Sequence, residues 1–252
     1  MTLTFMEPDW SLPAGVKACV TTRETGHSQG PWQAGNLADH VGDCPADVAA
    51  NRQALLTALG GGVQPVWLAQ THSTHALAID RPSVRLDEKV PQADASWTNQ
   101  KGLACTVLTA DCAPILLADQ NATAVAAIHA GWRGLVNGVV ANTIRGMPVP
   151  ADQLLAWVGP TIGPAHFEVG AEVFQAFVEA FEGAAACFQP VQTAPDTHYM
   201  ADLPGLVKIA MIQEGVQAIT LSDLCTYSDP QRFYSYRREG QTGRQASLIW
   251  LT

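Results

Sequence analysis

Charged side chains are scarce in this chain, and basic ones are the scarcer kind. Only 14 of the 252 residues are Lys or Arg, against 23 Asp and Glu, so the formal net charge is −9. Surfaces that bind nucleic acid or anionic membranes carry clusters of basic residues. The composition therefore argues against both of these partners.

The sequence also has no long apolar run and no targeting segment at its start. No run approaches the roughly 18 residues that indicate a membrane-spanning helix. The first residues, MTLTFMEPDW, include acidic side chains and lack the basic-then-apolar order of a signal peptide. We therefore expect a cytoplasmic protein that does not associate with a membrane.

Closely spaced cysteines, repeats and linkers are absent as well. The six cysteines, at positions 19, 44, 105, 112, 187 and 225, lie far apart and form no CxxC pair. In a reducing compartment, cysteines dispersed in this way are expected to be free thiols, most of them buried. Hydrophobic residues make up 47% of the chain. The expected organisation is a single domain over residues 1–252.

Three apolar runs are the most regular feature that is present. They cover Leu103–Ala110, Ile115–Ala118 and Thr123–Ile128, and each is bounded by turn residues. Short apolar runs with such boundaries predict buried strands. After the third run, a glycine-flanked turn opens a helical pattern that reaches position 145.

Shorter patterns predict the other elements of a mixed fold. We expect long loops over 24–36 and 80–94 and an exposed Ala- and Pro-rich stretch over 183–200. Predicted helices cover Ala46–Leu59, Glu172–Phe181 and Leu203–Glu214, and further strands cover Val16–Val20, Pro65–Ala69, Leu154–Val158, Ala218–Leu221 and Ala246–Leu251.

Three residues with metal-ligand chemistry follow predicted strands. His72 comes after the strand 65–69, Cys112 after the run 103–110, and His129 directly after the run 123–128. Two imidazoles and a thiolate suit zinc, and three protein ligands leave a fourth coordination position open. The residues therefore form a candidate zinc site.

The same residues allow other interpretations. Cys112 could be a nucleophile with His129 or His72 as its base, because a cationic His lowers the pKa of a neighbouring thiol. The three side chains could also be a buried Cys beside two structural histidines. An electron-transfer copper site also uses one Cys and two His, but a multi-copper oxidase needs many more ligand histidines, and this chain has seven His in all.

The arginines are notable because the chain has so few of them. Arg133 follows His129 by four residues and stands in a glycine-flanked turn that opens the predicted helix. A helix start with an Arg side chain favours an anion. The C-terminal arginines, which include Arg237, Arg238 and Arg244, are expected to lie on a solvated or salt-bridged face.

Several short motifs, taken in order, make the sequence recognisable. They are TTR at 21–23, NL at 36–37, NR at 51–52, QTHS at 70–73, ADC at 110–112, HAGWRG at 129–134, IG at 162–163, FEVG at 167–170, CTY at 225–227, SYRR at 235–238 and TGR at 242–244. Together they resemble the YfiH family, also called the laccase-domain or multicopper polyphenol oxidase family, over nearly the whole chain.

The resemblance implies an α+β fold of one domain, in which layered β-sheets are flanked by helices as an α/β/β/α sandwich. It implies a zinc site whose ligands, and catalytic residues, are His72, Cys112 and His129. On the matching motifs it also points to Arg23, Asn36, Gln70 and Arg133 as substrate contacts.

Members of this family are described as zinc-dependent enzymes that act on purine nucleosides. The resemblance thus implies phosphorolysis of adenosine, inosine or methylthioadenosine, with phosphate as co-substrate, and deamination of adenosine. Asp111 and Glu168 are the expected candidates for an acid or base, and we expect a monomer. An amide hydrolase that edits mis-built UDP-muramyl peptidoglycan precursors is the alternative enzyme, and a non-catalytic metal- or nucleotide-binding protein is the alternative from another class.

Overall fold

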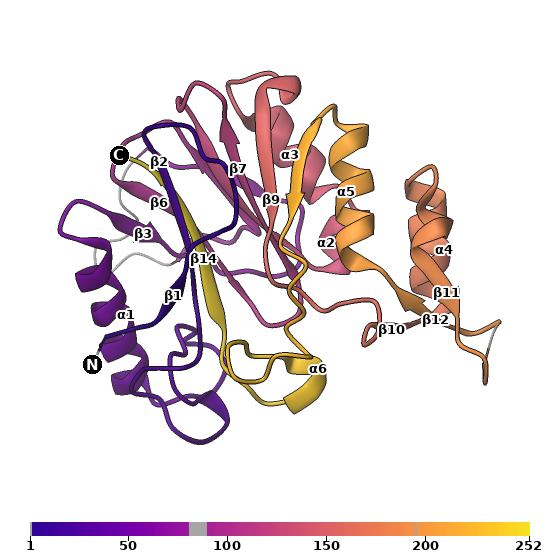
Figure 1. Cartoon of the computed structure of the whole chain (residues 1–252), viewed down its shortest axis with the longest axis horizontal. Coiled ribbons are helices and arrows are strands. Elements are labelled where there is room, and N and C mark those ends of the chain that lie inside the picture. The colour runs from indigo at the N-terminus through magenta and orange to yellow at the C-terminus, as the bar shows by residue number, and fades with distance from the viewer. Residues whose placement is uncertain (1, 81–89, 195) are drawn as a thin grey trace.

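Two large β-sheets lie face to face in the computed structural model, which describes residues 2–80, 90–194 and 196–252 (Figure 1). The five-stranded sheet has the order β1 (Phe5–Met6), β2 (Val16–Thr21), β14 (Gln245–Leu251), β6 (Leu103–Thr109) and β3 (Gln64–Val66). The six-stranded sheet has the order β13 (Ala218–Leu221), β9 (Leu154–Val158), β7 (Ala113–Asp119), β8 (Val125–Ala130), β5 (Ala95–Thr98) and β4 (Ala76–Ala78).

Alternating side chains of the central strands form the core between the two sheets. In β6, Cys105 and Val107 point into this core, and in β7 Leu116 and Ala118 do the same. Side chains of β9 and β14 complete it through Trp157 and Ile249. Because successive strand residues face opposite ways, the intervening residues of the same strands are free to bury against helices.

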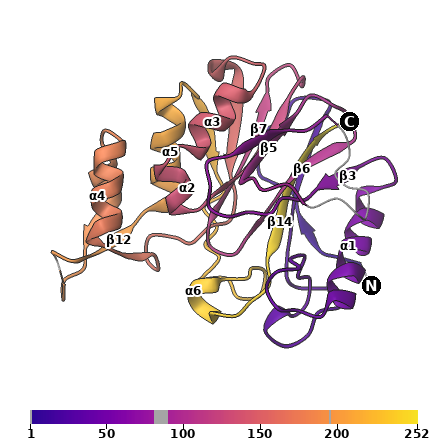
Figure 2. The same cartoon turned by 180° about the vertical axis from the view of Figure 1, so that it is seen from behind.

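Helices cover the outer faces of both sheets (Figures 1 and 2). On the five-stranded sheet, α1 (Pro45–Leu59) packs Leu55 against Leu108 and Leu248. On the six-stranded sheet, α2 (Trp132–Val136), α3 (Val139–Gly146) and α5 (Leu203–Gln213) cover a core that contains Ile115 and Leu117. The order helix, sheet, sheet, helix is the sandwich that the resemblance implied, and the fold class is confirmed.

A third, small sheet extends from this body together with α4 (Ala171–Ala180) (Figure 2). Its strands β10 (Glu168–Gly170), β12 (His198–Ala201) and β11 (Phe188–Pro190) are antiparallel. The stretch 183–200 was expected to be exposed, and most of its residues are. It also contains β11 and most of β12. They form because Phe188 and Ala201 pack into the same core as α4.

The sequence predicted one helix after Gly134, whereas the structure has two. Gly138 has a φ of +99°, and it separates α2 from α3. This left-handed conformation favours glycine and cannot continue a helix. The strands predicted over 154–158 and 218–221 match β9 and β13, and the other predicted helices and strands are present with shifted ends. The strands β1, β4, β5, β10, β11 and β12 were not predicted. Of the loop expected over 80–94, residues 81–89 lie outside the described part of the chain.

The chain passes from one large sheet to the other between β6 and β7. Residues 110–112 make this crossing, so Asp111 and Cys112 lie where the two sheets meet. β8 pairs antiparallel with β7 and sets His129 opposite Pro114. The topology thus brings the ends of two predicted strands to one place.

Two expectations about the chain as a whole can be compared with the structure. All six cysteines are free, which confirms the prediction of unpaired thiols, but only Cys19 and Cys105 are buried, so the expectation that most of them are buried is wrong. Within the described ranges, no helix has both the length and the apolar character needed to cross a membrane.

The long loop over 24–36 is ordered by one buried side chain of α1. Asn51 has no exposed surface. Its amide nitrogen donates to Ser28 Oγ, Ala34 O and Asn36 O, and its oxygen accepts from His27 N at 2.8 Å. A single amide thus holds both arms of the loop against the helix.

Replacing Asn51 by Ala should lower the free energy of unfolding by at least about 2 kcal/mol, because it leaves several buried polar groups without a partner. Chemical denaturation followed by circular dichroism measures the change. Gln53→Ala, at an exposed position of the same helix, is the control and should stay within about 0.5 kcal/mol of the wild type. An equally small effect for Asn51→Ala would contradict the role given to its side chain.

Candidate metal centre

The three residues proposed as ligands meet at one point of the structure. The ligand atoms of His72, Cys112 and His129 all lie within 4.8 Å of one another. Cys112 Sγ is 3.7 Å from His72 Nε2, and the two imidazole rings lie edge to face with centroids 4.8 Å apart. Two nitrogens and a sulfur are therefore placed to converge on a single ion.

His129 is oriented by a buried carboxylate. Its Nδ1 lies 2.8 Å from Oδ1 of Asp94, which has no exposed surface. An ionised carboxylate can only accept, so Nδ1 carries the proton and the lone pair of Nε2 is left for a metal. A backbone hydrogen bond also joins the two residues, because His129 N donates to Asp94 O at 2.7 Å.

The same carboxylate holds the loop that carries His72. The backbone N–H groups of Thr71, His72 and Ser73 donate to Asp94 at 3.1, 2.9 and 2.7 Å, and the Ser73 hydroxyl donates at 2.7 Å. His72 has a φ of +59°, a conformation that non-glycine residues adopt at a cost. The amides collected by Asp94 stabilise this turn, so one side chain sets the position of two ligands.

Cys112 is held from the opposite side through its neighbour. Asp111 has a φ of +94°, and both of its carboxylate oxygens are occupied. Oδ1 accepts from the Thr226 hydroxyl and Oδ2 from the backbone N–H of Arg237, each at 2.6 Å. The crossing between the sheets is thereby tied to the C-terminal segment.

The backbone of Gly131 packs against the site, and it leaves no room for a side chain. A Cβ atom at this position would lie 2.5 Å from His72 Cδ2 and 3.0 Å from Cys112 Sγ. Such contacts are too close for any larger residue. The backbone of the turn that follows β8 therefore packs directly against two of the three ligands.

The electrostatics of the site favour a charged thiolate. Burial opposes the ionisation of Cys112, but the charge and hydrogen bond of His129, followed by those of His72, outweigh it and lower the pKa to about 6. Burial likewise opposes protonation of His129, and the neighbouring Cys112 and Asp94 raise its pKa to about 9. In contrast, burial raises the pKa of Cys105 to about 12. Of the two, Cys112 has the ionised sulfur that a metal or an electrophile requires.

A cavity of about 400 Å³ opens above the three ligand residues. Its wall includes Gln70, His40, Tyr236 and Arg244. The space is in the size range of sites for small molecules. Tyr236 is 60% exposed, and it forms part of the cavity wall.

Of the four expected substrate contacts, the structure places Gln70 alone on the cavity wall. Its amide both donates to and accepts from the backbone of Leu108. Arg23 pairs with Glu239 at 2.6 Å, and the buried Asn36 bonds to Ala38, Asp43 and the backbone of Arg244.

Arg133 is exposed, with its guanidinium 4.3 Å above the Trp132 ring, and it does not line the cavity. The two acid/base candidates also lie elsewhere. Asp111 uses both oxygens within the protein, and Glu168 is on the exposed side of β10. Neither of them is part of the cavity wall.

Asp94 and Arg244 were the residues that sequence reasoning did not assign to the site. Asp94 gave no signal beyond that of an acidic residue at the end of an expected loop, which is common. For Arg244 the signal was a position after a glycine near the C-terminus, and it was expected on a solvated face. Their importance depends on contacts between distant parts of the chain.

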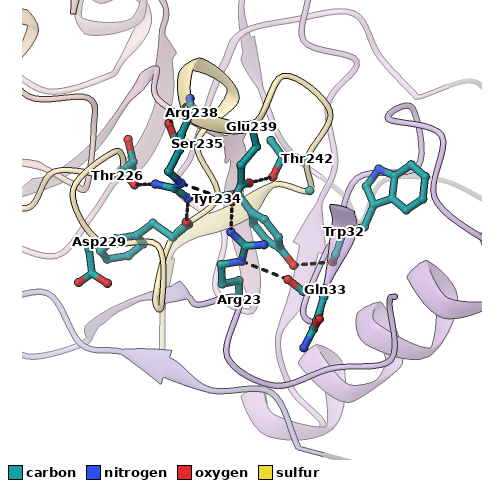
Figure 3. A network of polar contacts seen from close by, with 12 residues as sticks. Arg23, Trp32, Gln33, Thr226, Asp229, Tyr234, Ser235, Arg238, Glu239 and Thr242 are labelled. Atoms are coloured by element: carbon teal, nitrogen blue, oxygen red, sulfur yellow. Dashed lines mark hydrogen bonds and ion pairs between the residues drawn. The ribbon is translucent and has the colours of Figure 1, made fainter. Parts of the chain in front are cut away.

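A polar network holds the segment that presents Tyr236 and Arg244 (Figure 3). Glu239 accepts from Arg23, Arg238 and the Thr242 hydroxyl, and the Tyr234 hydroxyl donates to Trp32 O at 2.8 Å. Arg238 also donates to the carbonyls of Thr226, Tyr227 and Phe233. The network joins the loop after β2 to the segment before β14.

Several known proteins resemble this chain over nearly its whole length. The family model described as multi-copper polyphenol oxidoreductase laccase matches residues 17–252. A purine nucleoside phosphorylase of Pseudomonas aeruginosa is 48% identical over 247 residues, with 98% of each chain covered. The purine nucleoside phosphorylase YfiH of Escherichia coli is 42% identical, with 97% of each chain covered.

The structural comparison agrees with the sequence comparison. The crystal structure of a Neisseria meningitidis protein superposes with a TM-score of 0.91 at 43% identity and covers 98% of both chains. The match extends over the strands, the crossing and the C-terminal segment that build the centre. This chain therefore belongs to the laccase-like YfiH family.

Proposed function

We propose that this protein is a zinc-dependent purine nucleoside phosphorylase that also deaminates adenosine. The observation that carries the proposal is the His72, Cys112 and His129 group at the base of a cavity sized for a small molecule. The names of the relatives from Pseudomonas aeruginosa and Escherichia coli support the same reaction. Adenosine, inosine and methylthioadenosine are the proposed nucleosides, with inorganic phosphate as the second substrate.

The donor set fits zinc better than copper chemistry. Two imidazole nitrogens and one thiolate match a zinc site with an open fourth position, where the ion would act as a Lewis acid. A multi-copper oxidase needs several ligand groups, and His72, Cys112 and His129 form the one such group within the described residues. Among the described residues, the cavity wall includes no methionine that would serve as an axial copper ligand.

In phosphorolysis, an oxygen of phosphate forms a bond to C1′ of the ribose while the bond from C1′ to the purine breaks. The electron pair leaves with the purine, which takes up a proton. The protein must hold both reactants in line and exclude water from C1′. Tyr236 offers an exposed ring on which a purine can stack, and the imidazole of His40 on the same wall is the proposed proton donor to the purine.

Deamination requires a different arrangement. Zinc deaminases combine the metal with a carboxylate that transfers protons. The cavity wall has no carboxylate among the residues that the structure describes, and Asp111 uses both of its oxygens within the protein. We therefore propose phosphorolysis as the main reaction and deamination as the weaker one.

A product screen on the zinc-loaded protein tests the function. Inosine should yield hypoxanthine and ribose 1-phosphate only when phosphate is present, and adenosine should yield some inosine without it. Release of an amino acid from a UDP-muramyl precursor, without action on nucleosides, would establish amide hydrolysis instead. Tight nucleoside binding with no turnover of any of these compounds would make the protein a binding module.

The metal prediction concerns the ligands themselves. Cys112→Ala and His129→Ala should each lose stoichiometric zinc, as measured by elemental analysis, while the circular dichroism spectrum stays that of the wild type. Cys44→Ala, at an exposed thiol that is not part of the group, is the matched control and should keep its zinc. Full zinc retention by both ligand variants would contradict the site.

Asp94 is predicted to act on the metal through His72 and His129. In Asp94→Asn an amide NH₂ can face the donors that now converge on the carboxylate, so zinc affinity should fall about tenfold to a hundredfold. Competition with a chromogenic chelator measures this affinity independently of turnover. Asp152→Asn, on the surface helix before β9, should bind zinc like the wild type, and an unchanged affinity in Asp94→Asn would refute the positioning role.

A further inference from the structure

Arg244 differs from most of the arginines that the structure describes in what its guanidinium contacts. It lines the cavity with all three ligand residues, and none of the ion pairs within the described residues includes it. Five other arginines each pair with a carboxylate: Arg23, Arg52, Arg145, Arg232 and Arg238. Carboxylates outnumber basic groups in this chain. An arginine that lines a cavity and still has no carboxylate partner therefore needs an explanation.

The position of Arg244 is fixed by its backbone and by one end of its side chain. Its N–H donates to Asn36 Oδ1 at 2.9 Å, and Nη1 donates to the carbonyls of Thr242 and Gly243 at 3.0 and 2.9 Å. The ring of Tyr236 lies 5.9 Å from its Cζ. The network around Glu239 in turn holds the segment that contains both residues (Figure 3).

These contacts leave a defined part of the guanidinium available. Within the described residues, Nε and Nη2 of Arg244 make no hydrogen bond to protein. The N–H bonds of these two nitrogens are parallel and form the side-on edge of the group, which matches two oxygens of a phosphate or a carboxylate. Asp111, the carboxylate whose charge acts on Arg244, does not occupy this edge, because its oxygens are bonded to Thr226 and to the backbone of Arg237.

Partial burial strengthens the case for an anionic ligand. Burial lowers the pKa of Arg244, and the negative charges of Cys112 and Asp111 oppose that change. A guanidinium remains charged in such surroundings. A partly desolvated cation with two free donors binds an anion more strongly than a solvated one does.

We propose that the side-on edge of Arg244 binds the attacking phosphate, so that Arg244 is the phosphate-binding residue of this site. The inference rests on the proposed phosphorylase function. Nε and Nη2 donate to two phosphate oxygens, and a third oxygen is left to form the bond to C1′ of the nucleoside as the purine leaves with the electron pair. Arg244 transfers no proton in this step and acts by position and charge.

The test uses the zinc-loaded protein with Arg244→Lys and Arg244→Gln. Lysine keeps the charge but loses the two-donor edge, so KM for phosphate should rise about tenfold to a hundredfold, with a larger rise for Gln. KM for inosine, zinc content and deamination without phosphate should change less than threefold. Arg145→Gln removes an exposed arginine from its pair with Glu214 and serves as the matched control with an unchanged KM for phosphate.

A direct measurement separates this inference from the function on which it rests. Isothermal titration with inorganic phosphate should show binding to the wild type that Arg244→Gln weakens by the same factor. Arg244-dependent binding without any phosphorolysis would overturn the proposed function and keep the phosphate site. Phosphorolysis with an unchanged KM for phosphate in both Arg244 variants would overturn the site, as would a rise in KM for phosphate caused by Arg133→Lys instead.

Discussion

The carboxylate of Asp94 joins two parts of the candidate metal centre that are far apart in sequence. It is buried and accepts hydrogen bonds from three backbone amides, a hydroxyl and the imidazole of His129. Burial alone would raise the pKa of this group, but the bonds from His129 and Ser73 outweigh it and hold the pKa well below its usual range. An ionised carboxylate costs several kcal/mol to bury, and its five donors offset this cost.

Asp111 has a comparable role on the other side of the site. His72 and Asp111 both have a positive φ, and each is held by contacts from elsewhere in the chain. The amides around His72 converge on Asp94, whereas Asp111 binds Thr226 and the backbone of Arg237. Backbone conformations that are costly in isolation persist at functional sites where the surroundings determine them. Two acidic residues thus fix the ligands without being among them.

The sequence alone predicted the parts of this arrangement that depend on local pattern. The apolar runs predicted β6, β7 and β8, because strands buried on both faces consist of continuous apolar residues. The ends of these strands pointed to Cys112 and His129. Asp94 and Arg244 could not be found this way, since the contacts of Asp94 with His72 and His129, and that of Arg244 with Asn36, span more than twenty residues of the chain. The strands β1, β4 and β5 have two to four residues and no pattern that separates them from the neighbouring loops. Only the structure shows that Gly138 divides a helix.

The position of β14 has a consequence for how the protein is made. This strand comes last in the sequence, yet it lies between β2 and β6 in the middle of the five-stranded sheet. During translation, β2 and β6 leave the ribosome long before the strand that fills the gap between them, and their facing edges stay unpaired. All three ligand residues are therefore synthesised before the sheet can close. Until residues 245–251 emerge, the nascent chain exposes two unpaired strand edges. A chaperone can cover these edges, and a strand of a second nascent chain can pair with them.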